Sequence, residues 1–192
     1  MFPLLFFSYQ TGILYNMINL KFGDCIDVMQ GIPDGSIDMV LADPPYGMTQ
    51  CKWDSIIPID PMWKQLKRVT KPNAAIVLMS SQPFTTKLIS SNIDMFKYCW
   101  SWNKKLATGF LNAKKQPLRN IEDVCVFYRK QCVYNPNMVI RGKPKDKVGG
   151  RTPSNVYGKY YSTEKNINNK YYPTQYLEFS NANQKDKVHP TQ

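Results

Sequence analysis

Residues 37–47 read IDMVLADPPYG, and this stretch sets the fold expected for the chain. The run 37–42 is almost continuously apolar, which is typical of a strand buried on both faces of a parallel sheet. Residues 33–36, PDGS, precede it and have the composition of a turn. Asp43 and the residues after it therefore emerge at the carboxyl end of a buried strand, where open α/β sheets bind their ligands.

Short apolar runs alternate with helix-length segments on both sides of this stretch, and the alternation predicts an α/β sheet with crossover helices. Met62, Leu66 and Val69 fall on one face of the helix expected over 58–71. The sheet is expected to end near residue 128, because long apolar runs disappear beyond residue 129. The other expected elements are strands at 18–22, 74–79, 96–102 and 122–128 and helices at 26–30 and 83–93.

The chain is strongly basic, with 25 Lys and Arg residues against 14 Asp and Glu residues and a formal net charge of +11. Such an excess favours a polyanionic partner, with nucleic acid as the leading candidate. Residues 130–192 carry a net charge of +7 and residues 1–129 carry +4. Composition alone fits a solvated segment as well as a binding surface. The tyrosines interleaved between positions 157 and 176 favour the surface.

The cysteine and histidine content argues against a metal protein. The five cysteines include no Cys-x-x-Cys pair and His189 is the only histidine, so the ligand spacing of a zinc site is missing. We expect a reduced, cytoplasmic protein without a metal. Residues 1–16 are apolar but lack a basic head and are too short to span a bilayer. We interpret them as a doubtful extension before Met17 and expect no membrane association.

The tetrapeptide Asp43-Pro44-Pro45-Tyr46 has the composition of an acceptor site. Proline fixes φ at about −65° and lacks an N–H group, so the carbonyls and the Asp43 carboxylate form a rigid set of acceptors. Such a set suits an exocyclic amino group, which becomes nucleophilic when both its hydrogens are bound. Methyl transfer from a sulfonium then depends on positioning and electrostatics, and Tyr46 is expected to stack on a base flipped out of the duplex. The bare tetrapeptide also fits a surface turn.

Further blocks accompany the tetrapeptide in a fixed order. They are 23–24 (GD), 36–38 (SID), 75–78 (AIVL), 81–84 (SQPF), 100–104 (WSWNK), 120–127 (NIEDVCVF) and 189–192 (HPTQ). With these blocks the chain resembles the DNA N6-adenine and N4-cytosine methyltransferases of the beta arrangement, in which the catalytic half precedes the donor-binding half. The resemblance covers most of residues 17–129 and the last four residues.

The resemblance implies an α/β fold, namely an incomplete Rossmann-like sheet of the S-adenosylmethionine-dependent methyltransferases with a basic target-recognition region. It assigns 17–129 to the catalytic part of the methyltransferase domain, 130–188 to target recognition and 189–192 to the start of the linker to the donor-binding half. The implied reaction is site-specific methylation of adenine N6 in double-stranded DNA, with S-adenosylmethionine as donor, in the context of restriction–modification.

The resemblance also assigns roles to individual residues. The catalytic motif is Asp43, Pro44, Pro45 and Tyr46. The residues expected at the donor are Asp24, Asp43, His189, Thr191 and Gln192. The expected DNA contacts, around the loop at 107–110, are Lys104, Lys105, Lys114, Lys115 and Arg119. Asp24 equally fits a helix N-cap, His189 would otherwise be an unimportant exposed residue, and the basic residues equally fit simple solvated charge.

One departure from the family pattern concerns the donor. The family's Phe-x-Gly-x-Gly loop and the acidic residue on the next strand have no counterpart in this sequence. The residues around Gly149-Gly150 do not have the pattern of a strand followed by a glycine loop and a helix. We therefore expect a C-terminally truncated enzyme whose donor-binding half is supplied by a second chain, and an unstable fold with unpaired edges. The alternatives are a catalytically inactive DNA-binding remnant, or an enzyme acting on cytosine N4, RNA or a protein amide. Asp at position 43 favours adenine, because Ser is commoner there for cytosine and Asn for amides.

Overall fold

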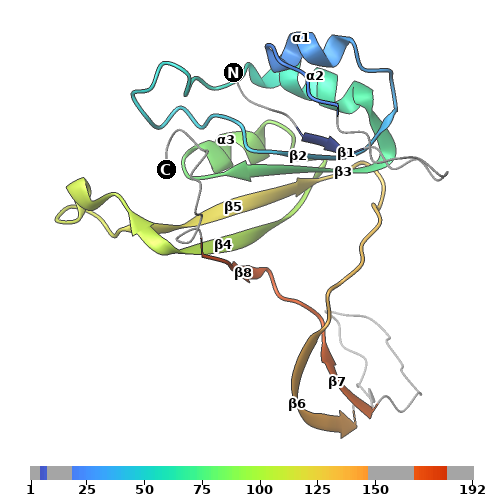
Figure 1. Ribbon diagram of the computed structural model, residues 1–192, viewed down its shortest axis with the longest axis vertical. Coiled ribbons are helices and arrows are strands. Elements are labelled where there is room, and N and C mark those ends of the chain that lie inside the picture. The colour runs from blue at the N-terminus through green and yellow to red at the C-terminus, as the bar shows by residue number, and fades with distance from the viewer. Residues whose placement is uncertain (1–4, 8–18, 147–166, 181–192) are drawn as a thin grey trace. The chain divides into compact units, whose positions relative to one another are not determined.

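The computed structural model describes residues 5–7, 19–146 and 167–180 (Figure 1). The chain divides into two compact units. The first comprises residues 1–133 and 175–192, and the second comprises residues 134–174. No helix of the described residues is long and apolar enough to cross a membrane.

The first unit is built on a mixed sheet that has six strands within the described residues, in the order β1-β2-β3-β5-β4-β8. The strands are β1 (Leu5–Phe7), β2 (Ile37–Ala42), β3 (Thr70–Ser80), β4 (Phe96–Thr108), β5 (Arg119–Phe127) and β8 (Tyr176–Glu178). β2 and β3 are parallel, and β3 and β4 both pair antiparallel with β5. β2, β3 and β4 therefore run in the same direction, and their carboxyl ends lie at the same end of the sheet. This arrangement confirms the predicted mixed α/β fold.

Three helices, α1 (Cys25–Gln30), α2 (Ile59–Val69) and α3 (Phe84–Ser90), lie on one side of this sheet (Figure 1). α2 follows β2 and leads into β3, which makes the parallel connection expected from the sequence. Its buried residues include Met62, Leu66 and Val69, so the predicted apolar face is confirmed.

The main core lies between the helices and the sheet. Phe127 of β5 is fully buried and packs edge-on against Trp63 of α2, with 4.9 Å between the ring centroids. The opposite sheet face carries a second apolar cluster around Val77, Val124 and Val126, flanked by half-buried aromatic residues of β4. None of the three helices belongs to this second cluster.

The structure corrects two predictions about the sheet. A strand was expected at 18–22, but described residues 19–22 are not a strand, and Leu20 and Phe22 are 84% and 89% exposed. The edge of β2 is instead paired antiparallel with β1, so this edge is not available to residues 19–22. The sheet also continues beyond residue 128, because β8 pairs in parallel with β4.

The second unit contains an antiparallel pair formed by β6 (Val139–Asp146) and β7 (Ile167–Tyr171). The guanidinium carbon of Arg141 lies 5.8 Å from the ring centroid of Tyr171, within the range of a cation–π contact. This pair falls within segment 130–188, interpreted as target recognition, of which residues 147–166 and 181–188 lie outside the described residues.

Candidate active site

The DPPY tetrapeptide directly follows β2, at the end of the sheet that holds the carboxyl ends of β3 and β4. Pro44 and Pro45 are buried, whereas Asp43 is exposed. Two buried prolines restrict the backbone, because their φ angles are fixed and packing prevents displacement. The carboxylate of Asp43 is thus presented to solvent from a rigid support.

Tyr46 links the carboxylate to the start of α3. Its hydroxyl group donates a hydrogen bond of 2.6 Å to Oδ1 of Asp43. Its ring stacks on Phe84, the first residue of α3, with 5.5 Å between centroids and 23° between planes. One oxygen of Asp43 is therefore engaged, and none of the described residues donates a hydrogen bond to Oδ2. Tyr46 remains half-buried.

The protonation state of Tyr46 follows from this environment. Burial raises the pKa of its hydroxyl group well above the usual range, and the charge of Asp43 and the hydrogen bond to it raise the pKa further. The hydroxyl group therefore stays a donor to Asp43 throughout the neutral and mildly alkaline range. It fixes the orientation of the carboxylate without competing for a proton.

Replacement of Tyr46 by Phe tests this contact through alkaline unfolding. The ordinary pKa of tyrosine is 10.0 and the folded pKa is higher, so the unfolded chain releases the proton first. Stability from this group is complete below pH 10.0 and falls as the pH rises above it. We expect the Tyr46→Phe variant to lose less stability than the wild type between pH 9 and about 11 in urea titrations. An identical alkaline slope in both proteins would contradict the assigned environment.

Asp54 holds the loop that follows the tetrapeptide. Its buried carboxylate accepts hydrogen bonds from the backbone N–H groups of Gly47 (2.8 Å), Met48 (2.8 Å) and Thr49 (2.6 Å). Burial alone would raise the pKa of Asp54, but the hydrogen bonds from Thr49, Gly47 and Met48 outweigh burial and lower it. Asp54 is therefore an ionised carboxylate inside a ring of amides.

Gly47 is required by the same turn. Its φ is +67°, and an added Cβ would lie 2.8 Å from Cγ1 of Ile56. Both the backbone conformation and the close packing thus exclude larger residues. Gly47 and Asp54 together fix the chain just after Tyr46.

A polar cluster lies where the end of β3 pairs with the middle of β5. Thr85 donates a hydrogen bond of 2.8 Å to Oδ2 of Asp123, and its Oγ1 lies 3.0 Å from Oγ of Ser80. Ser80 in turn contacts Cys125 at 3.2 Å, and Cys125 lies 3.3 Å from Cys99. The hydrogen bond to Cys125, followed by burial, raises the pKa of Cys99. This cluster ties α3, which carries Phe84, to the sheet beneath the site.

The structure is similar to two solved structures. The PvuII DNA methyltransferase (cytosine-N4-specific) superposes with a TM-score of 0.53 and 14% sequence identity, over 86% of this chain and 58% of that protein. The chain shares the fold of this DNA methyltransferase. A complex of M1.HpyAVI with SAM aligns with a TM-score of 0.39 and 15% identity, over 62% of this chain and 58% of that chain. No protein-family model and no curated protein matches the chain.

Within this methyltransferase-like fold, the predicted DNA contacts differ in their surroundings. Lys104 forms an ion pair with Glu122, and both side chains are largely buried. Lys105 forms a 2.8 Å ion pair with Glu178, whose hydrogen bond raises the lysine pKa. Nη1 of Arg119 lies 4.0 Å from Sδ of Met48.

Lys114 and Lys115 are exposed and form no ion pair with any of the described residues. The basic residues expected to contact DNA thus separate into paired ones near the sheet and unpaired ones farther out.

The predicted donor residues are only partly described. Asp24 caps α1, because its Oδ1 accepts a 2.8 Å hydrogen bond from the N–H group of Ile26. This confirms the N-cap interpretation and leaves the second oxygen for another partner. His189, Thr191 and Gln192 lie outside the described residues. No group of three or more potential metal ligands occurs in the part of the chain that the structure describes.

Sequence reasoning missed Asp54 and Phe84 as parts of the site. Phe84 lies in one of the family-like blocks, but nothing in the sequence connects it to Tyr46. A weak signal for Asp54 was present, since an acidic residue soon after a glycine turn commonly caps exposed N–H groups.

Proposed function

We propose that the chain is the catalytic part of an S-adenosylmethionine-dependent DNA methyltransferase that methylates N6 of adenine. The observation that carries the proposal is the exposed Asp43 carboxylate, which is held on buried prolines with Oδ1 engaged by Tyr46. Oδ2 accepts no hydrogen bond from any described residue, and it is therefore available to a ligand at the carboxyl end of β2, where open α/β folds bind substrates.

The proposed mechanism relies on acceptors. Oδ2 of Asp43 and the carbonyl group of Pro44 accept the two N–H hydrogens of the exocyclic amino group. The nitrogen lone pair is then released from the ring and directed at the methyl carbon. Preorganised acceptors stabilise the positive charge that develops on nitrogen. As the C–N bond forms, the bond between the methyl carbon and sulfur would break and the donor would leave as a neutral thioether, and the proton then passes from nitrogen to water or to Asp43. The face of Tyr46 opposite Phe84 stacks on the extruded base.

The residues present fit only part of the methyl donor, which supplies an electrophilic methyl group on sulfur. The second carboxylate oxygen of Asp24 suits a hydrogen-bond donor of the adenosyl group. The chain holds no Phe-x-Gly-x-Gly loop for the methionine and ribose groups. We therefore propose that these groups are held by residues beyond the 192 residues, in the same polypeptide or a second chain.

DNA is the proposed substrate because the chain carries a net charge of +11 and exposes Lys114 and Lys115, which form no ion pair with any described residue, beyond the end of β4. A second candidate is N4 methylation of cytosine, the specificity named for the PvuII enzyme. Asp43 itself favours adenine by the family resemblance. A DNA-binding remnant without catalysis is the third candidate.

Product analysis separates these candidates. The protein is expressed from its complete reading frame, together with any adjacent donor-half chain, and incubated with labelled S-adenosylmethionine and unmethylated genomic DNA. Hydrolysis and mass spectrometry should give N6-methyladenine. N4-methylcytosine would support the second candidate instead. Salt-sensitive DNA binding without labelled product, and without donor binding by calorimetry, would support the remnant.

A further inference from the structure

The hairpin between β4 and β5 ends in an exposed apolar tip. Gly109 adopts φ +91° and begins a short 3₁₀ turn, η1 (Phe110–Asn112). The side chain of Phe110 is 69% exposed, and that of Leu111 is fully exposed. Two adjacent large apolar residues at a protruding tip contribute nothing to the core of this fold. Their exposure is therefore better explained by a partner than by folding.

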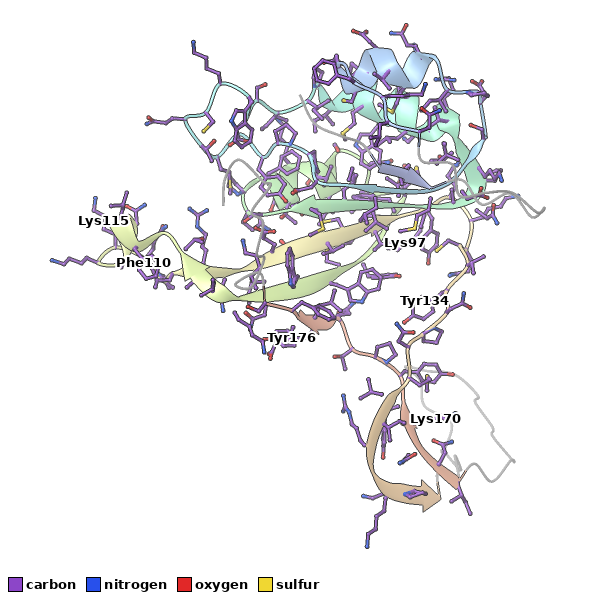
Figure 2. The ribbon with its side chains drawn as sticks, in the orientation of Figure 1. Lys97, Phe110, Lys115, Tyr134, Lys170 and Tyr176 are labelled. Carbon is purple, nitrogen blue, oxygen red and sulfur yellow. The ribbon has the colours of Figure 1, made fainter. Side chains whose placement is uncertain are left out.

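The charges around this tip have one sign. Residues 104–121 contain five Lys and Arg residues and no Asp or Glu. Lys104 and Lys105 are neutralised near the sheet by Glu122 and Glu178. Lys114 and Lys115 at the tip are exposed, and Figure 2 shows Phe110 and Lys115 together at the far end of the hairpin. The tip thus combines apolar side chains with unpaired cations.

The tip also lies at the same end of the sheet as Asp43. β3 ends at Ser80, which pairs with Asp123 of β5. The β4–β5 pairing continues beyond that point to the pair Thr108 and Arg119. At about 3.3 Å per residue, the hairpin extends roughly 13 Å past the end of β3 before its tip begins. Arg119, at the base of the tip, approaches Met48 in the loop after Tyr46.

We propose that the hairpin tip is a wedge that inserts Phe110 and Leu111 into the base stack of duplex DNA, while Lys114 and Lys115 bind the adjacent phosphates. The inference rests on the proposed function and deepens it. Duplex DNA combines an anionic exterior with an apolar interior, and proteins reach that interior by inserting apolar side chains between base steps. A base that flips into the Asp43 site leaves a gap in the stack, and a wedge on the same edge can fill it.

The test uses an intact mixed-sequence duplex and the same duplex with a single abasic site. A wedge must unstack the intact duplex but enters the abasic gap without that cost. We expect the wild-type protein to bind the abasic duplex about tenfold more tightly, the equivalent of roughly 1.4 kcal/mol. The double variant Phe110→Ser, Leu111→Ser should bind both duplexes equally. The fluorescence of 2-aminopurine beside the site should rise with the wild type and not with this variant.

Two controls isolate the wedge. Ile93→Ser replaces a residue that is 60% exposed and lies before β4, at the opposite end of that strand from the hairpin tip. This variant should retain the roughly tenfold preference for the abasic duplex. The double variant Lys114→Gln, Lys115→Gln should weaken binding to both duplexes alike and reduce the salt slope by about 2. Thermal unfolding of every variant should match the wild type, because the replaced side chains are exposed.

The inference is overturned if the wild type does not discriminate between the duplexes, or if the Phe110 and Leu111 variant keeps the preference. It is also overturned if that variant instead loses self-association or binding to anionic vesicles, since the tip would then meet a second copy or a lipid surface. Failure of the proposed function gives a different result. In that case no methylated product forms, while the wedge still discriminates between the two duplexes.

Discussion

By the proposed mechanism, replacement of Asp43 by Ala lowers the rate of methyl transfer by about a hundred- to a thousandfold. The carboxylate is exposed at the end of β2, and one of its oxygens is already oriented by Tyr46. The loss removes an acceptor that stabilises positive charge as it develops on the attacking nitrogen. Single preorganised groups of this kind typically contribute two to three powers of ten to turnover.

The kinetic pattern distinguishes a catalytic role from a folding defect. Because the interaction strengthens in the transition state, turnover should fall while DNA affinity stays near the wild-type value. Stability should drop only by the roughly 1–2 kcal/mol of the lost hydrogen bond from Tyr46. The matched control is Asp38→Ala, at the other end of β2, which breaks a partly exposed 2.7 Å ion pair with Lys71. That change should cost less than about 1 kcal/mol of stability and leave turnover intact.

Asp43→Asn adds a second comparison. Asparagine keeps an oxygen that can accept from Tyr46, but its amide nitrogen cannot accept a hydrogen bond from the substrate amino group. We expect it to be nearly as impaired as Asp43→Ala. Undiminished methylation in either variant would contradict the proposed mechanism.

The strand that leads to Asp43 could be predicted from sequence because its signal is local. Residues 37–42 form a run that is apolar except for Asp38, and the structure places it in β2 with the predicted boundaries. The helix α2 was predictable for the same reason, since its apolar spacing is self-contained. The predicted position of the candidate site follows from where this strand ends.

The contacts within the site could not be predicted, because they join residues whose patterns are unrelated. Nothing in the periodicity of α3 indicates that Phe84 stacks on Tyr46. The segment that becomes an edge strand is similarly decided by competition between segments for the same neighbouring strand. Residues 5–7 are all apolar and residues 18–22 alternate apolar with polar side chains, so both segments could form a strand. β2 has room for one neighbour on that side, which is β1. Pairing between distant segments depends on the whole sheet, and local sequence does not record it.

Asp54→Ala is expected to have the largest effect on stability in the site region, about 3 kcal/mol. Alanine would leave the N–H groups of Gly47, Met48 and Thr49 without their acceptor inside a partly buried turn. Each unsatisfied buried donor costs about 1–3 kcal/mol, and partial hydration of the loosened loop offsets some of the sum. Urea unfolding measures the difference directly.

A matched acidic control is available nearby. Asp60 lies in the first turn of α2 and is exposed, so Asp60→Ala should cost no more than about 1 kcal/mol. The pH dependence gives a further check. The folded pKa of Asp54 lies below the ordinary 3.8, so its stabilisation is complete above pH 3.8 and is lost as the pH falls below it. The wild type should therefore lose its advantage over Asp54→Ala as the medium becomes more acidic.

Activity should fall together with stability in Asp54→Ala, even at temperatures where the variant stays folded. The amides that Asp54 binds belong to the three residues directly after Tyr46, so a loosened loop releases the ring that orients Asp43. A displacement of about 1 Å at a reacting group can cost a hundredfold in rate. If Asp54→Ala were destabilised but fully active at low temperature, the 47–54 loop would support the fold without positioning the carboxylate. The buried prolines alone would then determine the orientation of Asp43.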